Sequence, residues 1–146
     1  MEIQKYRISR VVDDTYLMSG SWDNPELIFN MCKELGLADD IEERMHVISF
    51  DAGMNAVAVS EVAHGGTNGI FVDFSNIFRR ALVCGANRIV LVHNHPSGGL
   101  NASQEDIELT EKVIRTGREL NIELLDHIIV TNDDYMSMAE YEIGGF

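Results

Sequence analysis

The sequence predicts an α/β fold in three layers, helix–sheet–helix, with a mixed sheet in the middle. The segments 45–50 and 56–62 flank a turn at 51–53, which indicates a β-hairpin. Residues 88–93 form a near-continuous Ile/Val/Leu run, which is typical of a strand covered on both faces. Helical and strand patterns then alternate along the second half of the chain, as they do when helices pack against a sheet.

The elements of the first half follow from local signals. Residues 5–12 have the pattern of an edge strand. A helix is expected to begin after Asn24, because the next residue is proline, which suits the first helical turn, and apolar residues then recur at helical spacing. A second helix is expected over 76–84, with Ser75 as its N-cap and Gly85 as the residue that ends it.

The second half ends in a long helix and one more strand, expected over 103–121 and 124–130. The sequence holds no internal repeat, no low-complexity segment and no linker rich in Pro, Gly or Ser. A length of 146 residues suffices for one domain with its own core and is too short for two. We therefore expect residues 1–146 to form a single domain.

Composition limits the classes of partner and compartment. The chain has 11 Lys and Arg against 24 Asp and Glu, a formal net charge of −13. Such a surface repels polyphosphate, so direct binding to nucleic acid is not expected. No apolar run approaches the roughly 18 residues that span a bilayer, and the N-terminus lacks the hydrophobic core of a signal peptide. We expect a cytoplasmic protein with no membrane contact.

Two histidines mark the end of the buried strand. His93 and His95 lie two residues apart, so their side chains point to the same face, while Asn94 points to the other. Pro96 cannot donate a ladder hydrogen bond, and with the glycines that follow it ends the strand where the imidazoles emerge. Two converging imidazoles supply half of a four-ligand metal site.

A carboxylate on the long helix is expected to face the core. A rotation of about 100° per residue places Asp106 within an apolar stripe, while every other charged residue from 105 to 119 falls on the opposite arc. A buried carboxylate is costly unless it is paired or binds a cation. The apolar stripe consists of Ile107, Leu109, Val113, Ile114, Gly117 and Leu120.

The same residues also fit a helix cap. Ser103 stands three residues before Asp106, as in a capping box, although such boxes prefer Glu or Gln at that position. A cap does not explain why the acid faces inward, nor why two histidines precede it. Ser103 can cap the helix and still direct its hydroxyl toward a site.

His93, His95 and Asp106 form a three-ligand set of the kind that catalytic zinc uses, with one position left for water. Such a site also needs a group that takes the proton of that water. Glu61 is our candidate, because it closes an apolar strand and lies on the same face as two of its valines, where an acid without a partner is unfavourable.

The spacing of these residues resembles a known motif. The pattern Glu…His-x-His-x7-Ser-x2-Asp is similar to the JAMM motif of JAB/MPN metalloproteases, and the strings HNHPSG, SEVAHGGT and LLDHIIV resemble the RadC-like branch of that superfamily. The resemblance extends over about residues 40–146. Its five motif positions are Glu61, His93, His95, Ser103 and Asp106.

The resemblance implies a helix–sheet–helix sandwich related to the cytidine deaminases. It also implies one Zn²⁺ per chain, bound by the two histidines and Asp106. Glu61 would hold and deprotonate the water, and Ser103 would help to stabilise the oxyanion that forms in the transition state. The implied reaction is hydrolysis of an amide or isopeptide bond in a peptide or protein substrate.

Other functions remain open. In one, the metal only braces a non-catalytic interaction module. In another, the chain is an accessory of DNA metabolism, acting as a nuclease or through a partner, although its charge argues against direct contact with DNA. A cytidine deaminase would need His-x-Glu and Pro-Cys-x-x-Cys, which the sequence lacks.

His127 follows Asp126 on a strand, so only one of them can point toward the metal.

Overall fold

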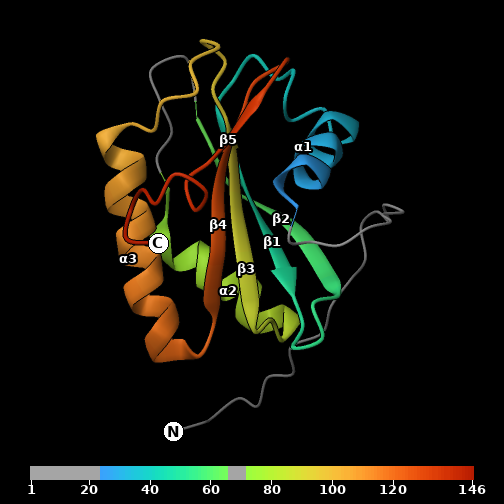
Figure 1. The fold of residues 1–146 in the computed structure, drawn as a ribbon. Helices are drawn as coiled ribbons and strands as arrows, with labels where there is room; N and C mark the ends of the chain where they lie inside the picture. The colour runs from blue at the N-terminus through green and yellow to red at the C-terminus, as the bar shows by residue number, and fades with distance from the viewer. Residues whose placement is uncertain (1–23, 66–71) are drawn as a thin grey trace, which may run out of the picture.

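The computed structural model describes residues 24–65 and 72–146 (Figure 1). Its elements are α1 (Pro25–Glu34), β1 (Arg44–Phe50), β2 (Ala56–His64), α2 (Phe74–Cys84), β3 (Arg88–Asn94), α3 (Gln104–Leu120), β4 (Glu123–Val130) and β5 (Tyr135–Ser137). The edge strand predicted at 5–12 lies outside the described residues, and β5 was not predicted. None of the helices in the described ranges is long and apolar enough to cross a membrane.

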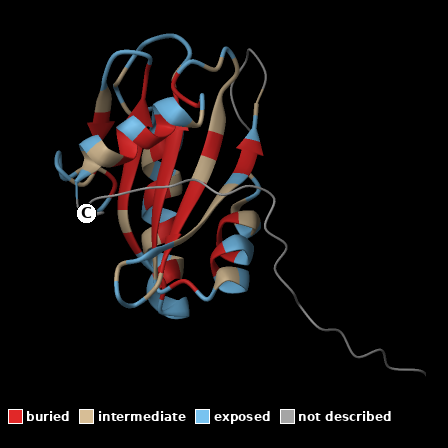
Figure 2. Ribbon diagram, turned by 90° about the vertical axis from the view of Figure 1, so that its right-hand side faces the viewer, coloured by how far each residue is buried: buried red, intermediate tan, exposed pale blue. Residues whose placement is uncertain are grey.

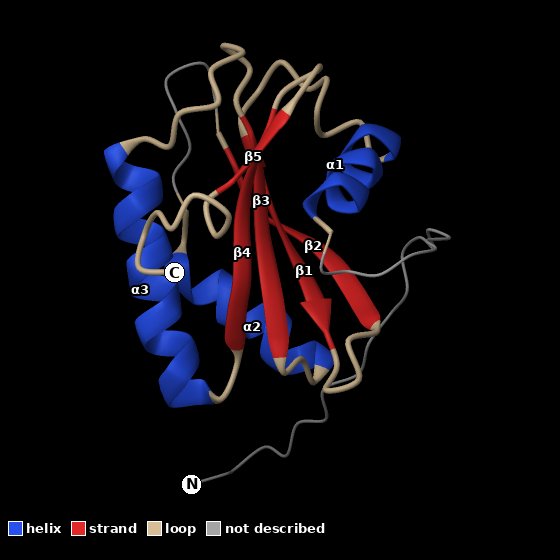
Figure 3. Ribbon diagram, viewed as in Figure 1, coloured by secondary structure: helices blue, strands red, loops and turns tan. Residues whose placement is uncertain are grey.

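A five-stranded sheet, in the order β2-β1-β3-β4-β5, forms the centre of the fold (Figure 3). β1 pairs antiparallel with both β2 and β3, whereas β3 and β4 run parallel and are joined by α3. β3 is therefore the middle strand, and every residue from Ile89 to Asn94 is buried, as its apolar run predicted. The predicted α/β class with a mixed sheet is confirmed.

Helices pack against both faces of this sheet, and buried residues run along the strands between them (Figure 2). One core cluster joins Ile77 of α2, Val113 of α3 and Leu91 of β3. A second cluster joins residues of α1 to Val92 of β3. Because successive residues of a strand alternate between faces, His93 lies on the same side as α2 and α3.

Two local predictions need correction. α2 begins two residues earlier than expected, because Asp73 and not Ser75 is its N-cap; the Asp73 side chain accepts a hydrogen bond from the Ser75 amide. Leu120, expected to face the core, is 39 % exposed. The buried stripe of α3 ends at Gly117, and Ile122, just beyond the helix, is buried in its place.

Candidate metal centre

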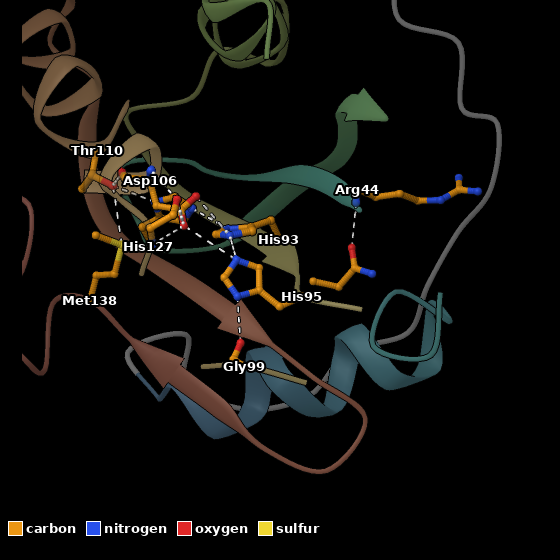
Figure 4. Close-up of polar contacts among 10 residues, drawn as sticks. Arg44, His93, His95, Gly99, Asp106, Thr110, His127 and Met138 are labelled. Carbon is orange, nitrogen blue, oxygen red and sulfur yellow. Dashed lines mark hydrogen bonds and ion pairs between the residues drawn. The ribbon is translucent and has the colours of Figure 1, made fainter. Parts of the chain in front are cut away.

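Two imidazoles meet at the C-terminal end of β3, in the middle of the sheet (Figure 4). His93 is fully buried, and His95 is partly exposed. The Nε2 atoms of the two rings lie 2.9 Å apart. The rings thus converge on one side of the strand, as expected from their spacing of two residues.

Asp106 brings a carboxylate from the first turn of α3 to the same point. Its Oδ1 lies 3.2 Å from Nε2 of His93, and its Oδ2 lies 3.7 Å from Nε2 of His95. The residue is 6 % exposed, which agrees with the inward direction predicted from the helical pattern. Two nitrogen atoms and a carboxylate from two different elements therefore face one another.

Ser103 caps α3 and holds the Asp106 carboxylate in place. Its Oγ accepts a hydrogen bond from the Asp106 amide at 3.1 Å and donates to Asp106 Oδ2 at 2.6 Å. The Ser103 amide donates to the same Oδ2 at 2.8 Å, which completes a capping box. The helix cap and the inward-facing acid are thus compatible, because Oδ2 closes the cap while Oδ1 faces His93.

The hydrogen bonds of His95 show which of its nitrogens is free to bind a cation. Its Nδ1 lies 2.7 Å from the carbonyl oxygen of Gly99, which can only accept, so Nδ1 carries the proton. In the neutral ring Nε2 then keeps its lone pair, and this atom faces His93 and Asp106. Nitrogen lone pairs and a carboxylate at such distances require a proton or a metal ion between them.

The donor set fits zinc. Tetrahedral zinc with ligand bonds of about 2.0–2.1 Å separates its ligand atoms by about 3.3–3.4 Å. The separations among His93 Nε2, His95 Nε2 and the Asp106 oxygens are 2.9, 3.2 and 3.7 Å, which span that value. Two imidazoles and one carboxylate are also the ligand types of catalytic zinc sites that keep a position for water.

The protonation of the site follows from its burial and pairing. Burial alone would raise the pKa of Asp106, but its interactions with the neighbouring His93 and His95 outweigh burial and hold that pKa well below the usual range. The hydrogen bond to Asp106 raises the pKa of His95, despite its partial burial. The carboxylate of Asp106 thus favours the charged form of His95, the neighbouring imidazole.

Glu61 lies apart from this group. It is opposite His46 in the β1–β2 pair, and His46 is opposite Val92 in the β1–β3 pair, so Glu61 faces the α1 side of the sheet. His93 faces the other side. Glu61 shares its strand face with Val57 and Val59, as expected, but it has a partner there: its side chain is 39 % exposed and contacts Arg44 Nη1 at 2.9 Å.

Glu43 is a carboxylate that the strand pairing brings to the histidines. Met45 lies opposite His93 in the antiparallel β1–β3 pair. Glu43, two residues earlier, therefore comes opposite His95 on the same face. Possible ligand atoms of Glu43, His93 and His95 all lie within 4.8 Å of one another. Sequence reasoning missed Glu43, because its position depends on which strand is the neighbour of β3.

Asn94 holds the segment that carries Glu43. Its side chain is buried on the face opposite to the two histidines. Its Oδ1 accepts from the Arg44 amide at 2.7 Å, and its Nδ2 donates to the carbonyl oxygens of Asp40 at 3.1 Å and Glu42 at 2.9 Å. The residue between the two imidazoles thus fixes the backbone on both sides of Glu43.

A third histidine lies behind His93. His127 of β4 places Nε2 2.8 Å from Nδ1 of His93, and its own Nδ1 is 2.7 Å from Oγ1 of Thr110 (Figure 4). Burial lowers the pKa of His127 well below its ordinary value. Its neighbour Asp126 does not join this group and accepts a hydrogen bond from Ser137, so only one of the pair faces the site, as expected.

Comparison with known proteins identifies the family. The family model of the RadC-like JAB domain matches residues 22–143. A UPF0758 protein of Finegoldia magna is 36% identical over 123 residues, 84% of this chain and 54% of the relative. A UPF0758 protein of Alkaliphilus oremlandii is 30% identical over 130 residues, 89% of this chain and 54% of the relative. The chain spans about half the length of these curated relatives. It belongs to the RadC-like JAB domain family.

Proposed function

We propose that this domain is a zinc-dependent hydrolase that cleaves peptide or isopeptide bonds, with His93, His95 and Asp106 as the metal ligands. The observation that carries the proposal is the convergence of the two Nε2 atoms and the Asp106 carboxylate at the end of the middle strand. The family resemblance further suggests the three-layer sandwich related to cytidine deaminases, which agrees with helices on both faces of the sheet.

When bound, a zinc ion would lower the pKa of a water molecule and polarise a carbonyl group. The chain supplies the groups around it. His93 is buried and His95 is partly exposed, so a substrate would approach from the side of His95. Ser103 orients Asp106 through two hydrogen bonds. In its proposed role toward an oxyanion, Ser103 would have to turn its hydroxyl from Asp106 toward the substrate oxygen.

The proton acceptor in this proposal is Glu43. It is partly buried and lies beside His93 and His95, within reach of a water bound between them. Glu61, the acceptor expected from the motif, lies on the other side of the sheet and is paired with Arg44. The motif and the strand pairing therefore give different acceptors, and the two carboxylates can be tested separately.

Metal content tests the ligand set. Protein purified without added metal should contain about one zinc per chain by elemental analysis, and His95→Ala should remove it. His64→Ala is the matched control, because His64 is an exposed histidine whose contacts are Glu42 and Glu61. Metal-free wild-type protein that also fails to take up added zinc would refute the ligand set.

Hydrolysis tests the reaction class. A peptide library and a set of isopeptide-linked peptides should yield cleavage products with zinc-loaded protein and none after chelation. An interaction module braced by metal would give no cleavage although it holds zinc. A protein with full zinc content and no cleavage of either substrate set would contradict the enzyme and leave the ligand set standing.

A further inference from the structure

A chain of buried hydrogen bonds runs behind the metal centre and returns to it (Figure 4). It passes from His93 Nδ1 to His127 Nε2 over 2.8 Å, and from His127 Nδ1 to Thr110 Oγ1 over 2.7 Å. Thr110 Oγ1 then donates to the backbone carbonyl oxygen of Asp106 at 2.6 Å. His93, His127 and Thr110 are each 0 % exposed. The chain thus connects two of the proposed ligands through protein groups alone.

The last hydrogen bond of this series, from Thr110 to Asp106, decides which atom is the donor in each of the others. The Asp106 carbonyl can only accept, so the Thr110 hydroxyl donates to it. The alternative acceptor, Sδ of Met138, lies 3.6 Å away and is a weak one. The hydroxyl has a single proton, so toward His127 its oxygen acts as an acceptor.

The same reasoning continues through the two rings. His127 donates from Nδ1 to Thr110, and a fully buried ring is neutral because burial disfavours its charged form. A neutral ring has one N–H, so Nε2 of His127 accepts, and it accepts from Nδ1–H of His93. The single proton of a neutral His93 is then on Nδ1, which leaves its Nε2 as a lone pair directed at the metal centre.

We propose that His127 and Thr110 are positioning residues that hold His93 in the tautomer with Nε2 unprotonated, and so prepare it to bind the metal. This proposal rests on the proposed ligand set. In this proposal His127 is not a ligand, although possible ligand atoms of His93, Asp106 and His127 lie within 4.8 Å of one another. Groups behind a ligating histidine orient its ring and set its basicity.

Nitrogen NMR of the metal-free chain tests the tautomer directly. Long-range ¹⁵N–¹H spectra of wild-type protein should show His93 protonated at Nδ1 and unprotonated at Nε2. In Thr110→Val, which keeps the shape of the side chain without the hydroxyl, this assignment should be lost or mixed. Thr110→Ser should restore it. A wild-type His93 that is protonated at Nε2 and bare at Nδ1 would overturn the proposal.

Metal binding tests the consequence. Thr110→Val and His127→Phe should weaken Zn²⁺ affinity by roughly 10- to 100-fold, with one ion still bound at saturation, and Thr110→Ser should bind nearly as wild type. The visible spectrum of Co²⁺-loaded protein should keep the same ligand number in His127→Phe. A spectrum that reports one nitrogen ligand fewer would make His127 a ligand and refute the positioning role.

The readouts separate this inference from the proposed function. A wild-type chain that binds no zinc would end the proposed ligand set, while the NMR tautomer of His93 would still report on the hydrogen-bond chain. If wild-type His93 has the expected tautomer but Thr110→Val binds zinc with unchanged affinity, the positioning role is refuted and the ligand set stands. His127→Gln serves as a second variant if His127→Phe does not fold.

Discussion

At the scale of single residues, two carboxylates can be distinguished as proton acceptors. Glu43→Gln keeps the shape and removes the charge, so it should lower the hydrolysis rate by roughly 10²- to 10⁴-fold, the usual contribution of a general base. Zinc content should not change, because the proposed ligands are untouched. Paired measurements of cleavage rate and bound zinc check this expectation.

Glu61→Gln is the matched control for that experiment. It changes the same chemical group on the opposite face of the sheet, where the carboxylate contacts Arg44. We expect its hydrolysis rate to stay within a few-fold of wild type. The reverse result, with Glu61→Gln inactive and Glu43→Gln active, would restore the acceptor expected from the motif.

These two acids also show what the sequence can and cannot predict at this scale. The convergence of His93 and His95 follows from strand periodicity, and the inward direction of Asp106 follows from helical periodicity. Both could therefore be predicted from the pattern within a single segment. Glu43 reaches the site only because β1 lies beside β3 in antiparallel register. That neighbour relation is a property of the folded sheet, and no pattern within one segment contains it.

At the scale of elements, Asn94 connects the middle strand to the segment 40–44. Asn94→Ala would remove three part-buried hydrogen bonds, one from the Arg44 amide and two to the carbonyl oxygens of Asp40 and Glu42, each worth about 0.5–1.5 kcal/mol. We expect faster hydrogen exchange at the Arg44 amide and a lower hydrolysis rate, since Glu43 loses its fixed backbone. Zinc content should persist.

Asn55→Ala is the control. Asn55 lies in the turn that joins β1 to β2, at the end of β1 away from Glu43. Like Asn94, Asn55 forms side-chain hydrogen bonds, but its partner is the nearby Asp51 in the same turn. Its loss should reduce stability without affecting hydrolysis per folded molecule. Equal losses of hydrolysis in the two variants would mean that Asn94 acts through general stability and not through Glu43.

The elements themselves were largely predictable, and the exceptions have local causes. The cap of α2 was misplaced because Asp73 and Ser75 are both suitable residues, and only the backbone angles decide between them. Leu120 continues the helical stripe in sequence, but the chain turns at Asn121 in a left-handed conformation, so Ile122 enters the core instead. β5 is only three residues long and gives too little pattern to predict.

At the scale of the whole molecule, the candidate metal centre joins elements that are distant in the sequence. His93 and His95 come from β3 and its end, Asp106 comes from the start of α3, and His127 connects them to β4. A single ion at this point would therefore link the middle of the sheet to the long helix. An ion that binds only the folded chain adds to the free energy of unfolding.

Thermal unfolding with and without zinc should reveal this link. Free zinc at about one hundred times Kd stabilises the folded state by about 2.7 kcal/mol, which raises Tm by several degrees for a chain of 146 residues. Calorimetry should show this increase in wild type and in His64→Ala. In His95→Ala the increase should disappear, because one of the three donors is gone. An equal increase in His95→Ala would place the stabilising ion elsewhere on the acidic surface, and the convergence of ligands at β3 would then not be its cause.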